Sequence, residues 1–298
     1  MKYRLIDEEK AYYPVSRLAR ALDITRAAYY ARSKRPLSRR AAEDTRLKEQ
    51  IRRVYADSHE LYGAPKIHME LKLAGGVAVG RKRVARLMRE LGICGVSKRR
   101  STRRRQSPRA EAQAAPDLVK RRFSATAPNQ LWVADITYIE TWEGYLFLAA
   151  VMDVHTKRIV GWSMRDDLKA DIVVDALGMA ATLRRPAPGL IHHSDRGGQY
   201  RSLALGKTLR ETGIMASMGS RGDAYDNAAA ESFMSTIKSE CVRRQTFKTR
   251  SQARLAVFTY IEGFYNPHRR HSAIGYLSPI EYETMLNDEP QTAVAVSM

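Results

Sequence analysis

The sequence predicts an α/β protein in two parts: a basic, all-α region followed by a domain built on a mixed sheet. Charge is the first observation, because residues 1–122 hold 32 basic and 13 acidic side chains whereas residues 123–298 hold 19 of each. Hydrophobic patterning is the second, because apolar residues recur at helical spacing early and gather in strand-like runs later. A basic part joined to a neutral part indicates a nucleic-acid-binding region attached to a region with another role.

Composition excludes several classes of protein. Apolar residues make up 44% of the 298-residue chain, enough for at least one hydrophobic core. Two cysteines, Cys94 and Cys241, can form neither a disulfide scaffold nor a four-ligand zinc site. The longest apolar run, residues 145–152, is far too short to cross a membrane, and the N-terminus lacks a signal-peptide pattern. We therefore expect a soluble, cytoplasmic protein with an anionic partner and no membrane association.

Residues 1–40 predict a helix-turn-helix-like segment. Residues 15–22 carry an apolar stripe at the spacing of a short helix. After a break at Asp23, Thr25 can cap a second short helix with the sequence TRAAYYAR. Two short helices with a tight break are typical of this DNA-binding motif, although any small helical hairpin has a similar pattern.

Residues 41–96 predict a second helical, DNA-binding domain. Its expected helices cover residues 43–55, 65–74 and 81–91. The last of these has an apolar stripe on one face and Lys82, Arg86 and Arg89 on another. An ordinary solvated face usually mixes acidic with basic residues, whereas here only Glu90 is acidic. This pattern favours contact between the helix and DNA phosphates.

The rest of the chain is expected to hold a basic linker at 97–122, a catalytic domain at 123–285 and a flexible tail at 286–298. Predicted strands cover residues 130–141, 145–156, 158–164, 190–194 and 214–220, and predicted helices cover 169–185, 202–213 and 226–240. A C-terminal helix closes the domain. The order β-β-β-α-β-α-β-α matches, by analogy, the ribonuclease-H-like fold, in which a mixed five-stranded sheet has helices on both faces.

Three carboxylates stand out in this domain. Asp135 interrupts an apolar strand, Asp195 directly follows another, and Glu231 lies on a predicted helix that Asn227 or its neighbour Asp226 can cap. Clustered carboxylates repel each other and raise each other's pKa, which divalent metal relieves. Two Mg²⁺ or Mn²⁺ ions on such ligands suit phosphoryl transfer.

Two further residues accompany the carboxylates. Lys238 shares a helix face with Glu231, two turns away, and is expected to contact a DNA phosphate. Asp153 lies in the second strand, where it is expected to support the site or cap the strand, with a role as a further metal ligand left open. Each carboxylate also has an ordinary structural interpretation as a strand-edge, turn or surface residue.

The spacing of the carboxylates and the sequence motifs around them resemble those of a known family. Asp135 and Asp195 are separated by 59 residues, and Asp195 and Glu231 by 35, as in the DD(35)E triad of integrases and transposases. The segments WVADITYI, VMDVHTKRIVGWSM, HSDRGGQY, GDAYDNAAAESFMSTIKSE and YNPHRRHSAIGYLSPIEYE resemble the OrfB product of bacterial insertion sequences of the IS-three family. The YGAPKI segment resembles the helix-turn-helix region of that family.

The resemblance implies a DNA transposase with an integrase core. Such an enzyme binds terminal inverted repeats and target DNA, and cuts and joins strands through a 3′ hydroxyl. It implies catalytic, metal-binding roles for the triad, and supporting or DNA-contacting roles for the C-terminal motif. The residues concerned in that motif are Tyr265, Asn266, Arg269, Arg270 and His271. Retroviral-type integrases begin with a zinc module that two isolated cysteines exclude here.

The resemblance also implies partners. Two DNA ends must be held together, so at least a homodimer is expected, nucleoid-associated in a bacterial cytoplasm. An upstream-frame OrfA product, or a fusion with it, is a possible further component. Two alternatives stay open from the sequence: a domesticated DNA-binding regulator with an idle catalytic core, and a structure-selective nuclease without strand transfer.

Overall fold

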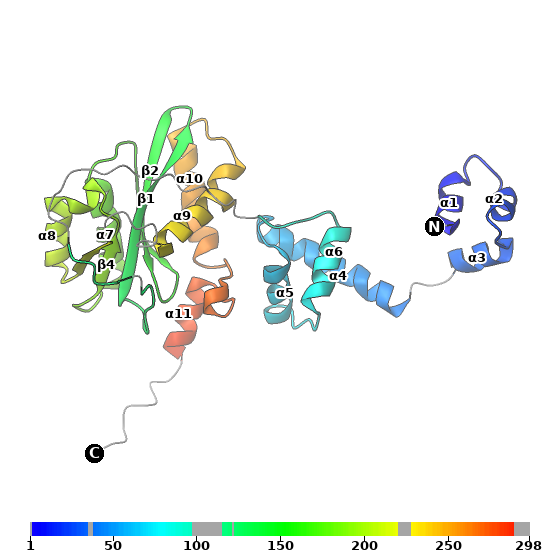
Figure 1. Cartoon of the computed structure of the whole chain (residues 1–298), viewed down its shortest axis with the longest axis horizontal. Coiled ribbons are helices and arrows are strands. Elements are labelled where there is room, and N and C mark those ends of the chain that lie inside the picture. Colours follow the sequence, from blue (N-terminus) through cyan, green and yellow to red (C-terminus); the bar gives the residue numbers. More distant parts are fainter. Residues whose placement is uncertain (1, 35–37, 97–114, 121, 220–227, 289–298) are drawn as a thin grey trace, which may run out of the picture.

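A five-stranded sheet forms the core of the C-terminal domain in the computed structural model, which describes residues 2–34, 38–96, 115–120, 122–219 and 228–288 (Figure 1). The strands are β1 (Leu131–Thr141), β2 (Gly144–Asp153), β3 (Ile159–Arg165), β4 (Ile191–Ser194) and β5 (Met215–Met218). Their order is β3-β2-β1-β4-β5. The first three pair antiparallel, whereas β4 is parallel to β1 and β5 is parallel to β4. The predicted ribonuclease-H-like fold is therefore confirmed.

Helices cover both faces of the sheet. They are α7 (Asp171–Arg184), α8 (Leu203–Glu211), α9 (Ala228–Glu240) and α10 (Arg250–Tyr260), and α11 (Pro279–Asp288) follows. Because side chains alternate along a strand, β1 contributes to two cores. Trp132 and Ala134 pack with α7 and α8, whereas Leu131 and Val133 pack with α9 and α10 on the opposite face. Strand β2, which lies between β3 and β1, is buried over most of its length, as its continuous apolar run predicts.

Close packing of α7 on β3 depends on Gly161. A Cβ atom added at Gly161 would lie 2.2 Å from the carbonyl oxygen of Ala176 on α7. We expect Gly161→Ala to lower the free energy of unfolding by about 1–3 kcal/mol, because the helix must move off the sheet. Urea denaturation measures the change. Gly178→Ala is the matched control on α7, because an added Cβ there meets no atom within 4 Å; equal losses for both variants would contradict this account.

The helices before the sheet form two units. They are α1 (Lys2–Glu9), α2 (Val15–Ala21), α3 (Arg26–Lys34), α4 (Arg39–Asp57), α5 (Ala64–Leu73) and α6 (Arg81–Glu90). Helices α1–α3 share a small core of Ile6, Ala19 and Tyr29. Helix α1 was not among the predicted elements, because Ile6 alone of its side chains is buried. In the described ranges, no helix is long and apolar enough to span a membrane.

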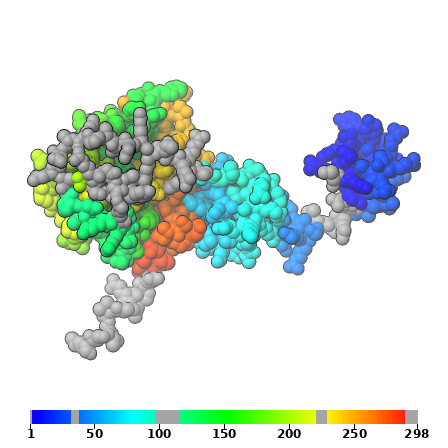
Figure 2. Space-filling model, viewed as in Figure 1, coloured from blue at the N-terminus to red at the C-terminus, as the bar shows by residue number. Residues whose placement is uncertain are grey.

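The unit α4–α6 packs against the C-terminal part of the sheet domain (Figure 2). The Tyr62 hydroxyl donates a hydrogen bond to the His268 carbonyl oxygen at 3.0 Å and accepts one from the Arg270 backbone N–H at 2.8 Å. The Arg270 guanidinium forms ion pairs with Glu70 of α5 and Glu281 of α11, each at 2.5 Å. These contacts join the helical unit to the sheet domain.

Residues 115–120, the end of the predicted linker, pack on the sheet domain. Val119 is buried in the main core, and the Leu118 N–H donates to the Ser217 hydroxyl of β5 at 3.0 Å. Burial of the apolar Val119 side chain explains this anchoring within an otherwise polar segment. Residues 97–114 of the predicted linker lie outside the described residues.

Candidate active site

Three carboxylates come from three different elements. Asp135 lies near the middle of β1, Asp195 directly follows β4, and Glu231 is in the first turn of α9. Strands β1 and β4 are parallel neighbours, and Val133 is paired with His193. Asp135 and Asp195 each lie two residues beyond this pair, so Asp195 reaches the level of Asp135 at the carboxyl end of β4.

The three carboxylates interact electrostatically. Burial raises the pKa of Asp135 to about 7, and the negative charges of Asp195 and Glu231 act in the same direction. Two groups oppose this rise in the pKa: the Ile136 N–H, which donates to Asp135 Oδ1 at 2.8 Å, and the Lys238 ammonium group. Asp195 and Glu231 are therefore both close enough to Asp135 for their charges to act on its carboxyl group.

Asp195 is held by the Gly-Gly turn that follows it. Its Oδ1 accepts a hydrogen bond from the Gly197 N–H at 2.9 Å. A Cβ atom added at Gly197 would lie 2.9 Å from the same oxygen, so a larger residue would displace the carboxylate. Tyr200 on the following 3₁₀ turn is buried, and burial together with the charges of Asp135 and Asp195 raises its pKa well above the usual range. The sequence analysis missed Tyr200, although the HSDRGGQY motif contains it.

The donor chemistry suits a divalent cation. Carboxylate oxygens are the hard ligands that Mg²⁺ and Mn²⁺ prefer, and a cation would relieve the repulsion around Asp135. Within the described part of the chain, no group of three or more His, Cys, Asp or Glu side chains is arranged to hold a metal ion. The electrostatics therefore fit a cation, whereas the observed side-chain positions do not form a finished ion site.

Lys238 in the last turn of α9 lies beside the strand that carries Asp135. Its Nζ is 4.6 Å from the centre of the Tyr138 ring on β1. Burial lowers the pKa of Lys238, and the Arg243 charge acts in the same direction, whereas the charges of Asp135 and Glu140 oppose both. The exposed Tyr138 is a second residue that the sequence analysis missed.

The C-terminal motif holds the end of α9. The buried Arg269 guanidinium donates to both carboxylate oxygens of Glu240, the last residue of α9, at 2.6 and 2.7 Å. The Tyr260 hydroxyl donates to the same carboxylate at 2.8 Å. The Tyr265 ring lies 5.5 Å from the guanidinium and packs edge-on against Phe233 of α9 at 5.2 Å. Arg269 and Tyr265 therefore anchor the helix that carries Glu231.

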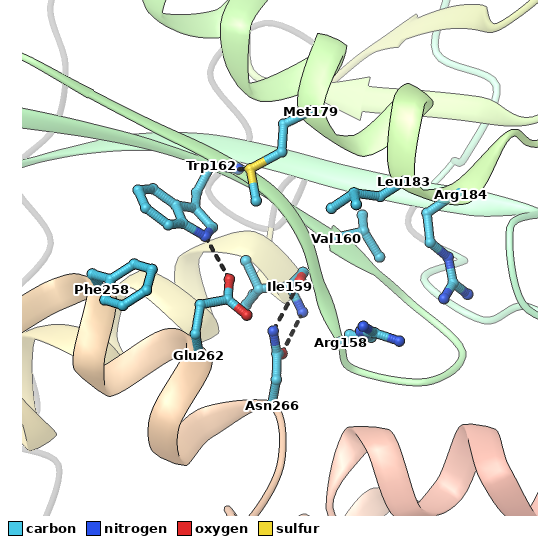
Figure 3. Close-up of a pocket in the computed structure, with 10 residues that line it drawn as sticks. All are labelled: Arg158, Ile159, Val160, Trp162, Met179, Leu183, Arg184, Phe258, Glu262 and Asn266. Atoms are coloured by element: carbon cyan, nitrogen blue, oxygen red, sulfur yellow. Dashed lines mark hydrogen bonds between the residues drawn. The ribbon is translucent and has the colours of Figure 1, made fainter.

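Other residues of this motif also have internal contacts. The Asn266 amide donates to the Ile159 carbonyl oxygen at 3.1 Å and accepts from the Ile159 N–H at 3.0 Å (Figure 3). This fastens the start of β3 beside a cavity of about 250 Å³, at the sheet edge opposite β5. His271 packs its ring against a buried tyrosine. The Arg269 guanidinium pairs with Glu240, and that of Arg270 pairs with Glu70 and Glu281, which gives both residues a structural role. The DNA contacts expected of them stay a prediction.

Asp153 lies away from the three carboxylates. The β1–β2 register places it three residues beyond the partner of Asp135. Its buried carboxylate accepts hydrogen bonds from the N–H groups of Asn129, His155 and Thr156 at 2.6, 2.9 and 3.0 Å. These bonds shape the turn after β2. Asn227, which was expected to cap the helix that carries Glu231, lies outside the described residues.

The basic face of α6 is partly neutralised. Lys82 and Arg89 are exposed, whereas Arg86 forms ion pairs with Asp44 of α4 at 2.6 Å and with Glu90 at 2.5 Å. The helical spacing in the sequence could not reveal Asp44, which belongs to another helix. Lys82 and Arg89 are therefore better placed than Arg86 to reach an anionic partner.

Comparison with known proteins agrees with this architecture. Residues 42–101 match the HTH-like domain family, and residues 125–224 and 212–279 match two integrase core domain families. The chain is 40% identical to the transposase for insertion sequence element IS629 of Shigella sonnei, over 94% of each chain. It is 36% identical to transposase InsF for insertion sequence IS3A of Escherichia coli, over 95% of this chain and 98% of that one. The transposase for IS904 of Lactococcus lactis is 38% identical, over 83% of this chain and 96% of its own.

The fold and these relationships define a DNA transposase with an integrase core, an enzyme of the DDE-type polynucleotidyl transferases. Within that class, the chain belongs to the IS-three family of insertion-sequence transposases. The family resemblance of the sequence motifs is thereby confirmed.

Proposed function

We propose that Asp135, Asp195 and Glu231 are the catalytic residues and that they bind two Mg²⁺ or Mn²⁺ ions. The observation that carries the proposal is the β1–β4 register, which brings Asp195 level with Asp135, while the charge of Glu231 on α9 also acts on the buried Asp135 carboxyl group. Acids that only shape turns or helix ends have no reason to gather in this way. When bound by these three carboxylates, the divalent ions would supply the positive charge that phosphoryl transfer needs at the reacting phosphate.

The protein's own groups position the reacting DNA. The rigid strand β1 carries Asp135, the Gly197 N–H orients Asp195, and the clamped helix α9 carries Glu231. Lys238, which lies beside Asp135, contacts the phosphate next to the scissile bond. The enzyme thus cuts a phosphodiester bond and joins the resulting 3′ hydroxyl to target DNA.

The helical unit α4–α6 supplies DNA binding in this proposal. It recognises the terminal inverted repeats, and its contacts with the sheet domain hold the bound end near the carboxylates. Two ends react together, so the active species is at least a homodimer. The upstream-frame OrfA product, either separate or fused, completes the assembly.

The direct test incubates the full chain with the DNA ends that flank its gene and with Mg²⁺ or Mn²⁺, and resolves the products by strand. We expect nicks at the element ends and joined strand-transfer products, and neither in the presence of a chelator. Cleavage without joined products would identify a structure-selective nuclease. Binding without cleavage would identify a regulator.

A second test concerns the salt dependence of DNA binding. We expect replacement of both Lys82 and Arg89 by Gln to weaken affinity for the inverted repeat and to reduce the slope of log K against log salt by about 2, one unit per lost phosphate contact. Fluorescence anisotropy at several salt concentrations measures this slope. Lys207→Gln, an exposed substitution on α8, is the control. An unchanged slope in the double variant means that α6 does not touch phosphate.

A further inference from the structure

Figure 1 shows the hairpin of β1 and β2, and several aromatic side chains on this hairpin are exposed. Tyr138 on β1 and Tyr145 on β2 are 50% and 52% exposed, and their rings meet edge to face at 5.2 Å. Phe147 extends the group, 6.3 Å from Tyr145, and Trp142 near the turn is 72% exposed. A group of exposed rings on one surface indicates a binding site, because rings of this size are usually buried.

The position of this aromatic group follows from the sheet topology. Strand β4 pairs with β1 only through Leu131–Val133, and the next bridge on β1 joins Thr141 to Phe247. Between these points, the β4 side of β1 has no paired strand in the described residues, and Lys238 reaches the Tyr138 ring. Tyr138 lies three residues after Asp135, about 10 Å along an extended strand. Side chains three residues apart leave a strand on opposite faces, so Asp135 and Tyr138 lie on either side of this open edge. Lys238 connects the two, because its Nζ contacts the Tyr138 ring and its charge interacts with that of Asp135. A DNA strand at the carboxylates would reach the rings by crossing this edge.

Cations accompany the rings. The Lys238 Nζ lies 4.6 Å from the centre of the Tyr138 ring, and the Lys248 Nζ lies 5.5 Å from that of Trp142. Aromatic faces beside ammonium groups fit a nucleotide, because the base stacks on the ring and the phosphate pairs with the cation. The interspersed charges favour nucleic acid over an apolar protein surface.

We propose that Tyr138 and Tyr145 form a stacking platform for an unpaired base of the DNA strand that is cut or joined, with Lys238 on its phosphate. This inference rests on the proposed function, because it requires a DNA strand at the three carboxylates. Stacking on the platform replaces the stacking that the base loses when the duplex opens beside the scissile phosphate. The platform accepts any base, since every base has an aromatic face.

Binding of single-stranded DNA tests the platform directly. The probe is an oligonucleotide of the element end with 2-aminopurine beside the scissile position, mixed with the full chain without divalent metal. We expect Tyr138→Ala together with Tyr145→Ala to weaken binding about 5- to 100-fold and to abolish the fluorescence quenching. We expect Tyr138→Phe together with Tyr145→Phe to keep both the binding affinity and the fluorescence quenching. Phe258→Ala, 49% exposed beside Trp162 of the edge strand β3, is the matched control and leaves both unchanged.

Cleavage assays separate this proposal from the proposed function. With Mg²⁺, we expect the double Ala variant to cut a fully paired end poorly and an end already opened by mismatches nearly as well as the unmodified chain. If the double Ala variant shows the same quenching and the same cleavage as the Phe258→Ala variant, the platform is overturned and the catalytic proposal stands. If the unmodified chain cuts no DNA, the catalytic proposal fails and the quenching alone decides the platform. If the double Ala variant no longer forms a dimer but keeps the quenching, the rings belong to a protein interface and the proposal is overturned.

Discussion

Glu231→Gln is expected to reduce strand cleavage and joining by on the order of 10³-fold or more, because a neutral amide can neither balance nor bind divalent cations as a carboxylate does. Asp195→Asn is expected to have the same effect. Cleavage of a labelled element end with Mg²⁺ measures the loss. Affinity for the inverted repeat should stay within about twofold, since neither residue belongs to the helical unit α4–α6.

Two controls sharpen this prediction. Glu211→Gln removes an exposed acid from α8 and should leave cleavage unchanged. Asp135→Asn should abolish cleavage yet unfold at a temperature no lower than that of the metal-free parent, because burial and the charges of Asp195 and Glu231 disfavour an ionised Asp135. Full activity in the Glu231→Gln or Asp195→Asn variant would remove the proposed triad.

Arg269→Ala is expected to lower the free energy of unfolding by about 3–5 kcal/mol, because it leaves the partly enclosed Glu240 carboxylate without its bidentate partner. Urea denaturation measures this loss. DNA cleavage should fall with it, since α9 carries Glu231 and loses the anchor at its last turn. Arg250→Ala, which removes a more exposed arginine at the start of α10, is the control and should cost about 1 kcal/mol or less.

The Arg269–Glu240 ion pair also makes the stability of the fold depend on pH. Burial acts to raise the pKa of Glu240, but the Arg269 guanidinium outweighs it and holds the pKa below the usual value of 4.5. The pair therefore contributes its stability fully above pH 4.5 and loses it as the pH falls through the lower folded-state value. Replacing both partners by Met should recover part of the stability lost in Arg269→Ala. A double variant as unstable as the single one would contradict this account.

Much of the fold could be predicted from local patterns. The apolar run after Glu143 predicted a central strand, and β2 is buried over most of its length. The segment LIHHS predicted a short strand that ends just before Asp195, as β4 does. A strand that is covered on both faces has a continuous apolar run, so it can be recognised in the sequence. Helix α1 escaped prediction because it buries one side chain, and the anchoring of residues 115–120 depends on β5, far away in sequence.

The sequence predicted the acids of the candidate site but not the contacts of the residues around them. An acid inside an apolar strand stands out in any sequence, so Asp135 was found directly. The roles of the basic residues were harder to predict. A basic residue gives the same sequence pattern whether it contacts a DNA phosphate or a carboxylate far away in the chain. Arg86 meets Asp44, and Arg269 meets Glu240, through contacts that only folding creates. The exposed ring of Tyr138 had no sequence signal that distinguished it from an ordinary strand residue.

The sequence by itself determined the order of the five strands and of the helices between them, the division into basic and neutral parts, and the acids at transposase spacing, because these depend on periodicity and residue type along the chain. The tertiary structure alone decided which charges neutralise each other and which rings stay exposed beside Asp135. Ion pairing and burial depend on distances between segments that lie far apart in the chain, and those distances exist only once the sheet and its helices have packed.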